Sequence, residues 1–390
     1  MTFFRHGCKP FLLICLIFLT AQSFSHQTPL ESHFDFTYQV RIASVPKEAG
    51  ELEIWVPIAK SDQYQKILNY QINSPYPYQL LEDPEYGNKI LHLSFDKPPA
   101  QPFNLQIRYE VQVHGEKRTY EELKKQEFSD ETLKEGQENF KLYLTSQSLL
   151  VINDRVRKIA WEVTKNKKND LEKAKAIYDY VIDHMVYDKS GKGWGQGSTV
   201  YACEYGRGNC TDFHSLFISL ARAIGIPARF KIGAQVPDDK KEGTIGYHCW
   251  AEFFLPKKGW IPVDTSEAWK HPELRDFYFG SHDPGKFFIS LGRDISLKPA
   301  QKGDPVNIFI YPYVEIDGKP FESVESQFLF KNKVDYVTKS VHLQTYHLNA
   351  EGILARKPAR NSSEVARSHF LISNQEVNKE QKEVSNEKVF

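Results

Sequence analysis

The sequence predicts an α+β protein in which helices pack on a small antiparallel sheet, preceded by a β-sandwich-like N-terminal domain. Three observations lead to this prediction. Short alternating strands fill residues 32–115, an amphipathic helix begins at Cys210, and two strands joined by a short connection lie between residues 247 and 264. A run of strands followed by helices and a second small sheet is typical of the α+β class.

The composition of the 390-residue chain fits a globular protein of two or three domains. Lys+Arg and Asp+Glu number 50 each, and the absence of net charge argues against a nucleic-acid partner. Aromatic residues make up 13% of the chain, which supplies enough apolar area for sizeable cores.

The first residues have the features of a secretory signal. A basic start precedes an apolar run over residues 11–19, which is too short to cross a membrane, and small residues around Ser25 predict cleavage there. We therefore expect residues 1–25 to be a signal peptide. The mature protein would be periplasmic or extracellular, with no stable membrane insertion after cleavage.

Residues 32–115 are expected to form the β-sandwich-like domain. Polar and apolar residues alternate with period two in four segments, and turn residues separate them. The expected strands are 33–40, 52–56, 91–95 and 104–111. We find no catalytic chemistry in this domain and assign its aromatic strand positions to the core.

A polar connector over residues 116–148 leads to two expected helices. Apolar residues recur at helical spacing over residues 153–163 and again over 170–185. The glycine-rich segment 191–197 follows; it contains only half of a dinucleotide-binding fingerprint and no strand precedes it, so we exclude a phosphate-binding loop.

The stretch from Gly208 to Ile224 predicts the helix that organises the chain. Asn209 is a good N-cap, Asp212 stands at the capping-box position, and Gly225 ends the helix. Cys210 would then lie in the first turn, where unpaired N–H groups and the helix dipole favour a thiolate. The alternative is that Cys210 is only a small buried hydrophobic residue.

Two strands with a hairpin connection follow, one carrying His248 and the next ending at Asp264. A cysteine at a helix start, a histidine and an aspartate are the parts of a nucleophile, base and orienting group. Pairing of Leu255 with Gly259 would leave Asp264 diagonal to His248 on one face, so the loop must have an odd length or a bulge. Taken singly, His248 also fits a core histidine and Asp264 a turn cap.

Beyond this hairpin the chain remains rich in β-strand signals. Residues 228–234 are expected to form the first strand of the small sheet, and further strands are expected at 306–311 and 328–330. We assign residues 271–340 to a β-rich C-terminal extension. Residues 341–390 lose hydrophobic density and are expected to be a polar, disordered tail.

Several segments in the same order resemble the transglutaminase-like superfamily, and in particular its bacterial, exported members. They are Gly-Asn-Cys-Thr-Asp-Phe-His at 208–214, residues 220–229, Tyr-His-Cys-Trp-Ala-Glu-Phe at 247–253, and Gly-Trp-Ile-Pro-Val-Asp at 259–264. The resemblance implies a papain-like core over residues 144–270. It also implies a Cys–His–Asp triad, which maps onto Cys210, His248 and Asp264.

The implied activity is that of a thiol enzyme that acts on peptide or side-chain amides through a thioester. Hydrolysis of the thioester is favoured over transfer of the acyl group to an amine. The backbone N–H of Cys210 would bind the oxyanion. The segment around Trp194 would wall the cleft, or Trp194 would simply pack. The superfamily resembles cross-linking enzymes, proteases, deamidases and inactive relatives alike, so the alternative is an inactive binding or structural module.

No metal or cofactor is expected. Cys203, Cys210, His214, His248 and Cys249 do not follow the spacings of zinc ligands, and no acidic loop has EF-hand spacing. His214 is assigned to packing or to helix-surface polarity.

The cysteines behind the expected signal peptide are odd in number, which in an oxidising compartment leaves at least one free thiol. Strand alternation points Cys249 away from the cleft. Two arrangements remain open, a Cys203–Cys249 disulfide or a free Cys249 thiol packed under the nucleophile helix.

Overall fold

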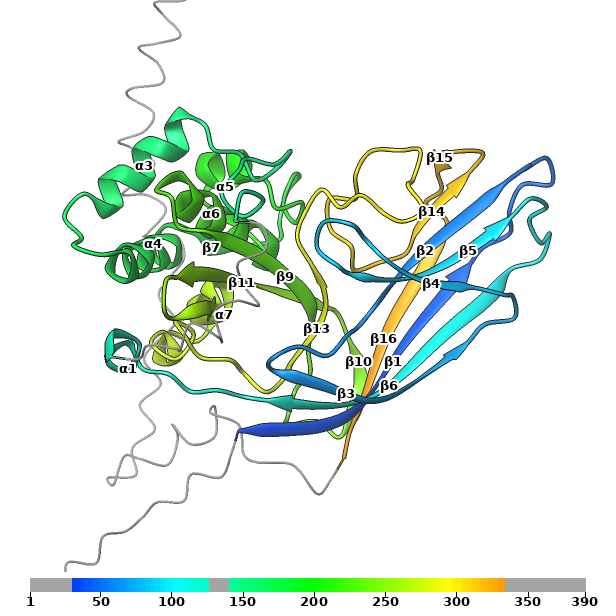
Figure 1. Cartoon of the computed structure of the whole chain (residues 1–390), viewed down its shortest axis with the longest axis horizontal. Coiled ribbons are helices and arrows are strands. Elements are labelled where there is room, and N and C mark those ends of the chain that lie inside the picture. The colour runs from blue at the N-terminus through cyan, green and yellow to red at the C-terminus, as the bar shows by residue number, and fades with distance from the viewer. Residues whose placement is uncertain (1–29, 126–139, 334–390) are drawn as a thin grey trace, which may run out of the picture.

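The structure is a computed structural model, which describes residues 30–125 and 140–333. The expected signal peptide and C-terminal tail lie outside the described residues. Within the described ranges, no helix has the length and apolar character needed to cross a membrane. Two lobes stand side by side, a helical lobe built on a small sheet and a β-sandwich (Figure 1). The α+β fold class is therefore confirmed.

The sandwich consists of two antiparallel five-stranded sheets. The first contains, in spatial order, β10 (Glu242–Ile245), β16 (Val324–Asn332), β1 (Glu31–Ile42), β6 (Phe103–His114) and β3 (Gln65–Asn73). The second contains β15 (Lys319–Pro320), β14 (Tyr313–Ile316), β2 (Leu52–Ile58), β5 (Lys89–Phe95) and β4 (Gln79–Glu82).

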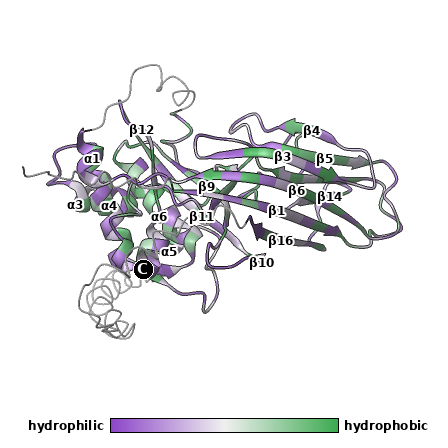
Figure 2. Cartoon of the chain, turned by 90° about the horizontal axis from the view of Figure 1, so that it is seen from below, coloured by the Kyte–Doolittle hydropathy of each residue, from purple (hydrophilic) through white to green (hydrophobic). Residues whose placement is uncertain are grey.

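Period-two alternation explains how the long sandwich strands pack. In β1, every second residue from Phe34 to Ile42 is buried, and β6 follows the same rule from Phe103 to Val113. The two strands pair along their whole length, so their apolar residues enter one core. Figure 2 shows hydrophobic and hydrophilic residues mixed along these strands. All four N-terminal strands expected from the sequence are present, and β3 and β4 are additional.

Residues that we expected in a C-terminal extension complete both sheets of the sandwich. β16 pairs with β1, and β14 pairs with β2. The prediction of a strand at 306–311 is wrong, since Val306 makes only an isolated bridge to Ile295. Side chains take the place of a neighbouring strand here: the Ser290 and Tyr38 hydroxyls donate hydrogen bonds to the carbonyl oxygens of residues 309 and 310.

The helical lobe surrounds a four-stranded antiparallel sheet of order β12-β11-β9-β13. Its strands are β12 (Gly259–Val263), β11 (Tyr247–Leu255), β9 (Ala228–Gln235) and β13 (Lys286–Leu291). Its helices are α1 (Tyr120–Lys125), α3 (Asp154–Thr164), α4 (Asp170–His184), α5 (Thr199–Tyr205), α6 (Cys210–Ala223), α7 (Thr265–Lys270) and the 3-10 turn η1 (Pro272–Leu274). The short strands β7 (Val186–Tyr187) and β8 (Arg207–Gly208) pair in parallel.

Local sequence accounts for the two helices that precede the site. Asn153 and Asn169 cap α3 and α4, and each accepts a hydrogen bond from a backbone N–H in the first turn. Both helices are confirmed. The expected polar connector contains the one-and-a-half-turn helix α1, and α5 and α7 are further short helices that we did not predict.

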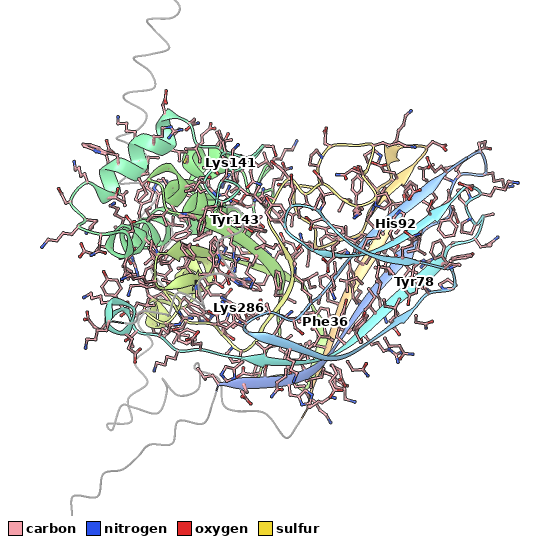
Figure 3. The ribbon with its side chains drawn as sticks, in the orientation of Figure 1. Phe36, Tyr78, His92, Lys141, Tyr143 and Lys286 are labelled. Carbon is pink, nitrogen blue, oxygen red and sulfur yellow. The ribbon has the colours of Figure 1, made fainter. Side chains whose placement is uncertain are left out.

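Strand β13 joins the helical lobe to the sandwich. The Phe287 ring lies 4.4 Å from the Phe36 ring, inside the sandwich core. The buried side-chain amide of Gln65 pairs with the backbone N–H and C=O of Phe288, at 2.7 and 2.8 Å. Asn88 pairs in the same way with residue 291. Figure 3 shows Phe36 on the sandwich side of this junction and Lys286 on the other.

Candidate active site

The helix that carries Cys210 begins as the sequence predicts. The Asn209 side chain accepts the Thr211 N–H at 2.9 Å, and Asp212 Oδ2 accepts the Asn209 N–H at 3.0 Å, which together form a capping box. Gly225, with φ of +84°, follows the end of the helix. Because Cys210 is the first residue of α6, its N–H has no acceptor within the helix. The cap and helix predictions are confirmed.

Asp212 also anchors the glycine-rich segment against the helix start. Its two carboxylate oxygens accept the N–H groups of Gly195 at 2.7 Å and Gly197 at 3.0 Å. Gly208 fits beneath this carboxylate only because it lacks a side chain, since a Cβ there would lie 2.2 Å from Asp212 Oδ2. This glycine-rich segment is therefore held against the start of α6.

The hairpin register brings His248 and Asp264 to one face. Leu255 pairs with Gly259 and Ala251 with Val263, across a connection of residues 256–258. Gly259 has a φ of +71°. This odd-length loop is the one that the geometric argument required, and it leaves Asp264 diagonal to His248.

The two carboxylate oxygens of Asp264 have different partners, the start of α7 for Oδ1 and the His248 ring for Oδ2. Oδ1 caps α7 by accepting the Glu267 N–H and the Ser266 hydroxyl, both at 3.0 Å. Oδ2 lies 2.7 Å from His248 Nε2. The turn-cap and triad interpretations of Asp264 are thus compatible, because each uses a different oxygen.

Cys210 at the start of α6 and His248 on β11 each shift the pKa of the other. A hydrogen bond from the Cys249 thiol, and then the facing His248 imidazolium, lower the pKa of Cys210 well below its usual range despite burial. Burial by itself would lower the pKa of His248, but Asp264 and Cys210 outweigh it and raise that pKa to about 10. A thiolate–imidazolium pair is the favoured state of these two groups.

A lysine that sequence reasoning missed completes the surroundings of Asp264. Lys286 Nζ lies 2.8 Å from Asp264 Oδ2, and the lysine side chain is 1% exposed. Although burial would raise the pKa of Asp264, Lys286 and then His248 lower it well below its usual range. Nothing local in the sequence indicates this contact, because a lysine at the start of an apolar strand reads as a solvated strand end.

His214 is buried and hydrogen-bonded to backbone groups of the site. Its assignment to helix-surface polarity is therefore wrong, and the packing assignment fits. Its Nδ1–H donates to the carbonyl oxygen of Cys210 at 2.7 Å, and its Nε2 accepts the Thr265 N–H at 3.1 Å. These bonds place a neutral ring between α6 and α7. His214 therefore fixes the distance between the helix of Cys210 and the segment of Asp264.

Cys249 points toward α6, with its sulfur 3.7 Å from His214 Nδ1. Cys203, Cys210 and Cys249 are all free and buried, which corresponds to the packed-thiol arrangement. Burial, together with the neighbouring Cys210, raises the pKa of Cys249 well above its usual range. The Cys249 thiol therefore stays protonated and donates to the thiolate of Cys210.

Aromatic and polar side chains lie around the start of α6. Asn209 donates to the Tyr247 hydroxyl at 2.8 Å. Burial and the nearby Cys210 raise the pKa of Tyr187 to about 12. The ammonium of Lys189 lies 5.9 Å from the Trp194 ring. The role of Trp194 in substrate binding stays a prediction.

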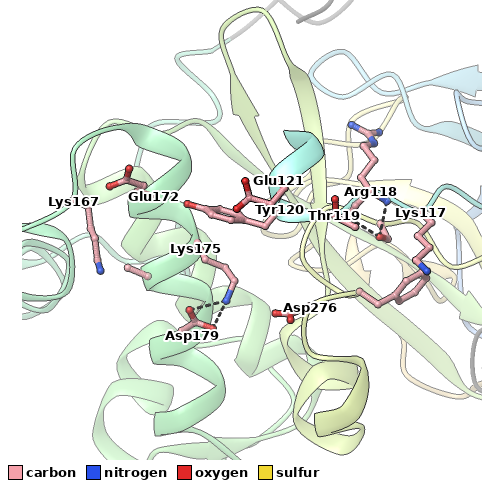
Figure 4. Close-up of a pocket in the computed structure, with 13 residues that line it drawn as sticks. Lys117, Arg118, Thr119, Tyr120, Glu121, Lys167, Glu172, Lys175, Asp179 and Asp276 are labelled. Atoms are coloured by element: carbon pink, nitrogen blue, oxygen red, sulfur yellow. Dashed lines mark hydrogen bonds and ion pairs between the residues drawn. The ribbon is translucent and has the colours of Figure 1, made fainter. Parts of the chain in front are cut away.

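Two other features of the described residues bear on function. No group of three or more His, Cys, Asp or Glu side chains in the described ranges is placed to hold a metal ion. A cavity of about 690 Å³ lies between α1, α4 and the segment after α7 (Figure 4). Charges of both signs line it, among them Lys175 and Asp179, but Cys210, His248 and Asp264 do not.

Comparison with known proteins identifies similar sequences and a similar fold. Residues 157–265 match the transglutaminase-like superfamily. An uncharacterized protein of Haemophilus influenzae is 27% identical over 349 residues, which cover 79% of this chain and 91% of the relative. The uncharacterized protein YebA of Bacillus subtilis is 27% identical over 134 residues, 30% of this chain and 18% of the relative.

A solved structure from Cytophaga hutchinsonii, described as a candidate cysteine protease, has a similar fold. Its TM-score is 0.51 at 14% identity, over 78% of this chain and 99% of that one. The likeness therefore extends over the sandwich as well as the helical lobe. The segment that contains Cys210, His248 and Asp264 lies within the residues that match the transglutaminase-like superfamily.

Proposed function

We propose that this protein is an exported cysteine-dependent amide hydrolase or acyltransferase that uses Cys210, His248 and Asp264 as a catalytic triad. The observation that supports this most directly is the position of His248, whose Nε2 lies 2.7 Å from Asp264 Oδ2 and whose ring interacts with Cys210. A nucleophile, a base and an orienting carboxylate in this order are the requirements of covalent acyl chemistry.

The reaction would proceed through a thioester. The Cys210 thiolate attacks the amide carbonyl carbon, and the Cys210 N–H at the helix start binds the oxyanion. Collapse breaks the C–N bond as the His248 imidazolium donates its proton to the leaving nitrogen. Neutral His248 then accepts a proton from water, or from an acceptor amine, which attacks the thioester and restores the thiolate.

The substrate class follows from this chemistry and from access to the nucleophile. Cys210 is 3% exposed, which leaves little room for an acyl group to approach, and Tyr187 and Tyr247 lie near it. We infer a peptide or protein side-chain amide, with hydrolysis favoured over transfer. The same low exposure is also what an inactive binding module of this fold would show, and this alternative is decided by experiment.

The test is turnover of a panel of peptide and glutamine amides, with and without a primary amine acceptor. Wild type is expected to release product or to incorporate the amine, and Cys210→Ala to do neither while it keeps the same thermal unfolding midpoint. Cys203→Ala is the matched control, since Cys203 lies on α5 and its substitution should leave turnover unchanged. Equal turnover by wild type and Cys210→Ala would contradict the proposal.

A further inference from the structure

Lys286 shares one carboxylate oxygen with the proposed catalytic histidine. Its Nζ lies 2.8 Å from Asp264 Oδ2, and His248 Nε2 lies 2.7 Å from the same atom. The two nitrogen atoms are therefore within about 5.5 Å of each other, the sum of these two distances. Two cationic groups thus converge on one oxygen in the interior of the protein.

The position of Lys286 in the sheet makes this contact specific. The residue begins β13, at the opposite sheet edge from β12, the strand after which Asp264 follows. Its ammonium lies 5.4 Å from the Trp250 ring and 5.6 Å from the Tyr278 ring, and Asp264 is its only ion-pair partner in the described part of the chain. With so little water nearby, its charge acts strongly on its neighbours.

We propose that Lys286 is a buried positioning residue of the triad, which holds the Asp264 carboxylate in place and weakens the hold of His248 on its proton. This inference rests on the proposed function of Cys210, His248 and Asp264. Lys286 acts through Asp264 and His248 and does not itself touch substrate.

The electrostatic argument has a definite sign. The ammonium of Lys286 stabilises the carboxylate of Asp264 and disfavours a second positive charge on His248. Without this opposition, a buried imidazolium next to a carboxylate would hold its proton too tightly to release it to the leaving nitrogen. The lysine therefore favours proton donation during acylation and a neutral His248 during attack on the thioester.

The two neighbouring histidines do not supply this charge. His214 accepts a backbone N–H at Nε2 and is neutral there, although that atom lies 3.4 Å from Asp264 Oδ1. Burial and then Lys286 lower the pKa of His282 well below its usual range, so this ring is neutral too. Among the described residues, further titratable groups that face Asp264, His248 or Lys286 are Tyr178 on α4, Glu267 and Lys270 on α7, Tyr278 before β13 and Cys249 on β11. Lys231 on β9 acts on His282 and pairs with Asp62 and Glu252.

The experiment measures the titration of His248 by NMR in ¹⁵N-histidine-labelled full-length protein, in a Cys210→Ala background that removes the thiolate. His248→Gln identifies the signal. Coulomb's law at about 5.5 Å with an effective dielectric constant of about 20 predicts that Lys286→Met raises the pKa of His248 by about 2 pH units. Lys286→Arg keeps the charge and should stay within about half a unit of the background.

Asp264→Asn is the opposing control, because loss of the carboxylate must lower the pKa of His248. Lys286→Gln, which keeps an N–H donor but not the charge, should behave as Lys286→Met and replaces it if the methionine variant does not fold. A pKa of His248 that is unchanged or lowered in the neutral variants would overturn the proposal, since a lysine that merely fills space has one of these effects.

The measurement also separates this inference from the proposed function. It requires no turnover, so the expected change in titration with no amide cleavage by wild type would count against the proposed function alone. Normal turnover with an unaltered His248 titration would count against the role of Lys286 alone.

Discussion

Alkylation of Cys210 as a function of pH tests the thiolate–imidazolium pair. The pKa of Cys210 lies well below its usual range, and that of His248 is about 10. Both groups should therefore remain charged between about pH 6 and pH 9. We expect the rate at which iodoacetamide modifies Cys210 in wild type to be nearly constant over this interval.

The size of the rise in alkylation rate expected for His248→Ala between pH 6 and pH 9 follows from the ionisation of an ordinary thiol. With a pKa of about 8.5, a cysteine is about 0.3% thiolate at pH 6 and about 75% at pH 9, a rise of roughly 240-fold. We expect the rate for Cys210 in His248→Ala to rise by on the order of 100-fold, because the helix start and the Cys249 thiol still favour some thiolate. The ratio of rates within one variant cancels differences in intrinsic nucleophilicity.

The assay is mass spectrometry of the Cys210 peptide after timed exposure to iodoacetamide. Cys203 and Cys249 serve as internal controls, since burial raises the pKa of each thiol. Cys203→Ala should leave the ratio for Cys210 unchanged. A wild-type rate that rises between pH 6 and pH 9 as steeply as that of His248→Ala would refute the ion pair.

Three further predictions concern stability and redox state. Gly208→Ala places a Cβ 2.2 Å from Asp212 Oδ2 at a φ of +154°, and should lower the free energy of unfolding in urea by about 2–3 kcal/mol, whereas Gly246→Ala, with open space around it, should not. Lys231 lowers the pKa of Asp62 from 3.8 to about 2 against the effect of burial. This pair therefore contributes its full stabilisation above about pH 4, and the free energy of unfolding should fall by about 2 kcal/mol as the pH falls toward 2. This acid dependence should be smaller in Asp62→Asn. The unreduced, denatured protein should show three free thiols after residue 25 in a colorimetric thiol assay, and one would indicate a disulfide.

Local patterns were sufficient to predict the part of the site that local interactions build. The start of α6 depends on Asn209, Asp212 and the apolar spacing that follows, all within one short segment. The face shared by His248 and Asp264 depends on the parity of a hairpin loop, which the sequence displays. These features need no knowledge of the rest of the chain.

Features that depend on distant contacts were not predictable in this way. The second role of Asp264 as the cap of α7 is visible only once the sheet holds its other oxygen near His248. The apolar residues at 306–311 have the pattern of a strand, but hydroxyl groups from β13 and β1 satisfy two of their carbonyls. β16 finds its partner β1 nearly three hundred residues earlier in the sequence.

The sandwich, in which we found no chemistry, contributes to the site through β13. The bounds expected for the core, 144–270, stop short of this strand, yet β13 is the fourth strand of the core sheet and carries Lys286. Phe287, the next residue, is held among aromatic rings of the sandwich, and Gln65 binds the backbone of Phe288. Because the sandwich fixes these two neighbours, it also fixes the start of the lysine side chain that reaches Asp264. The candidate site is therefore a property of both lobes together.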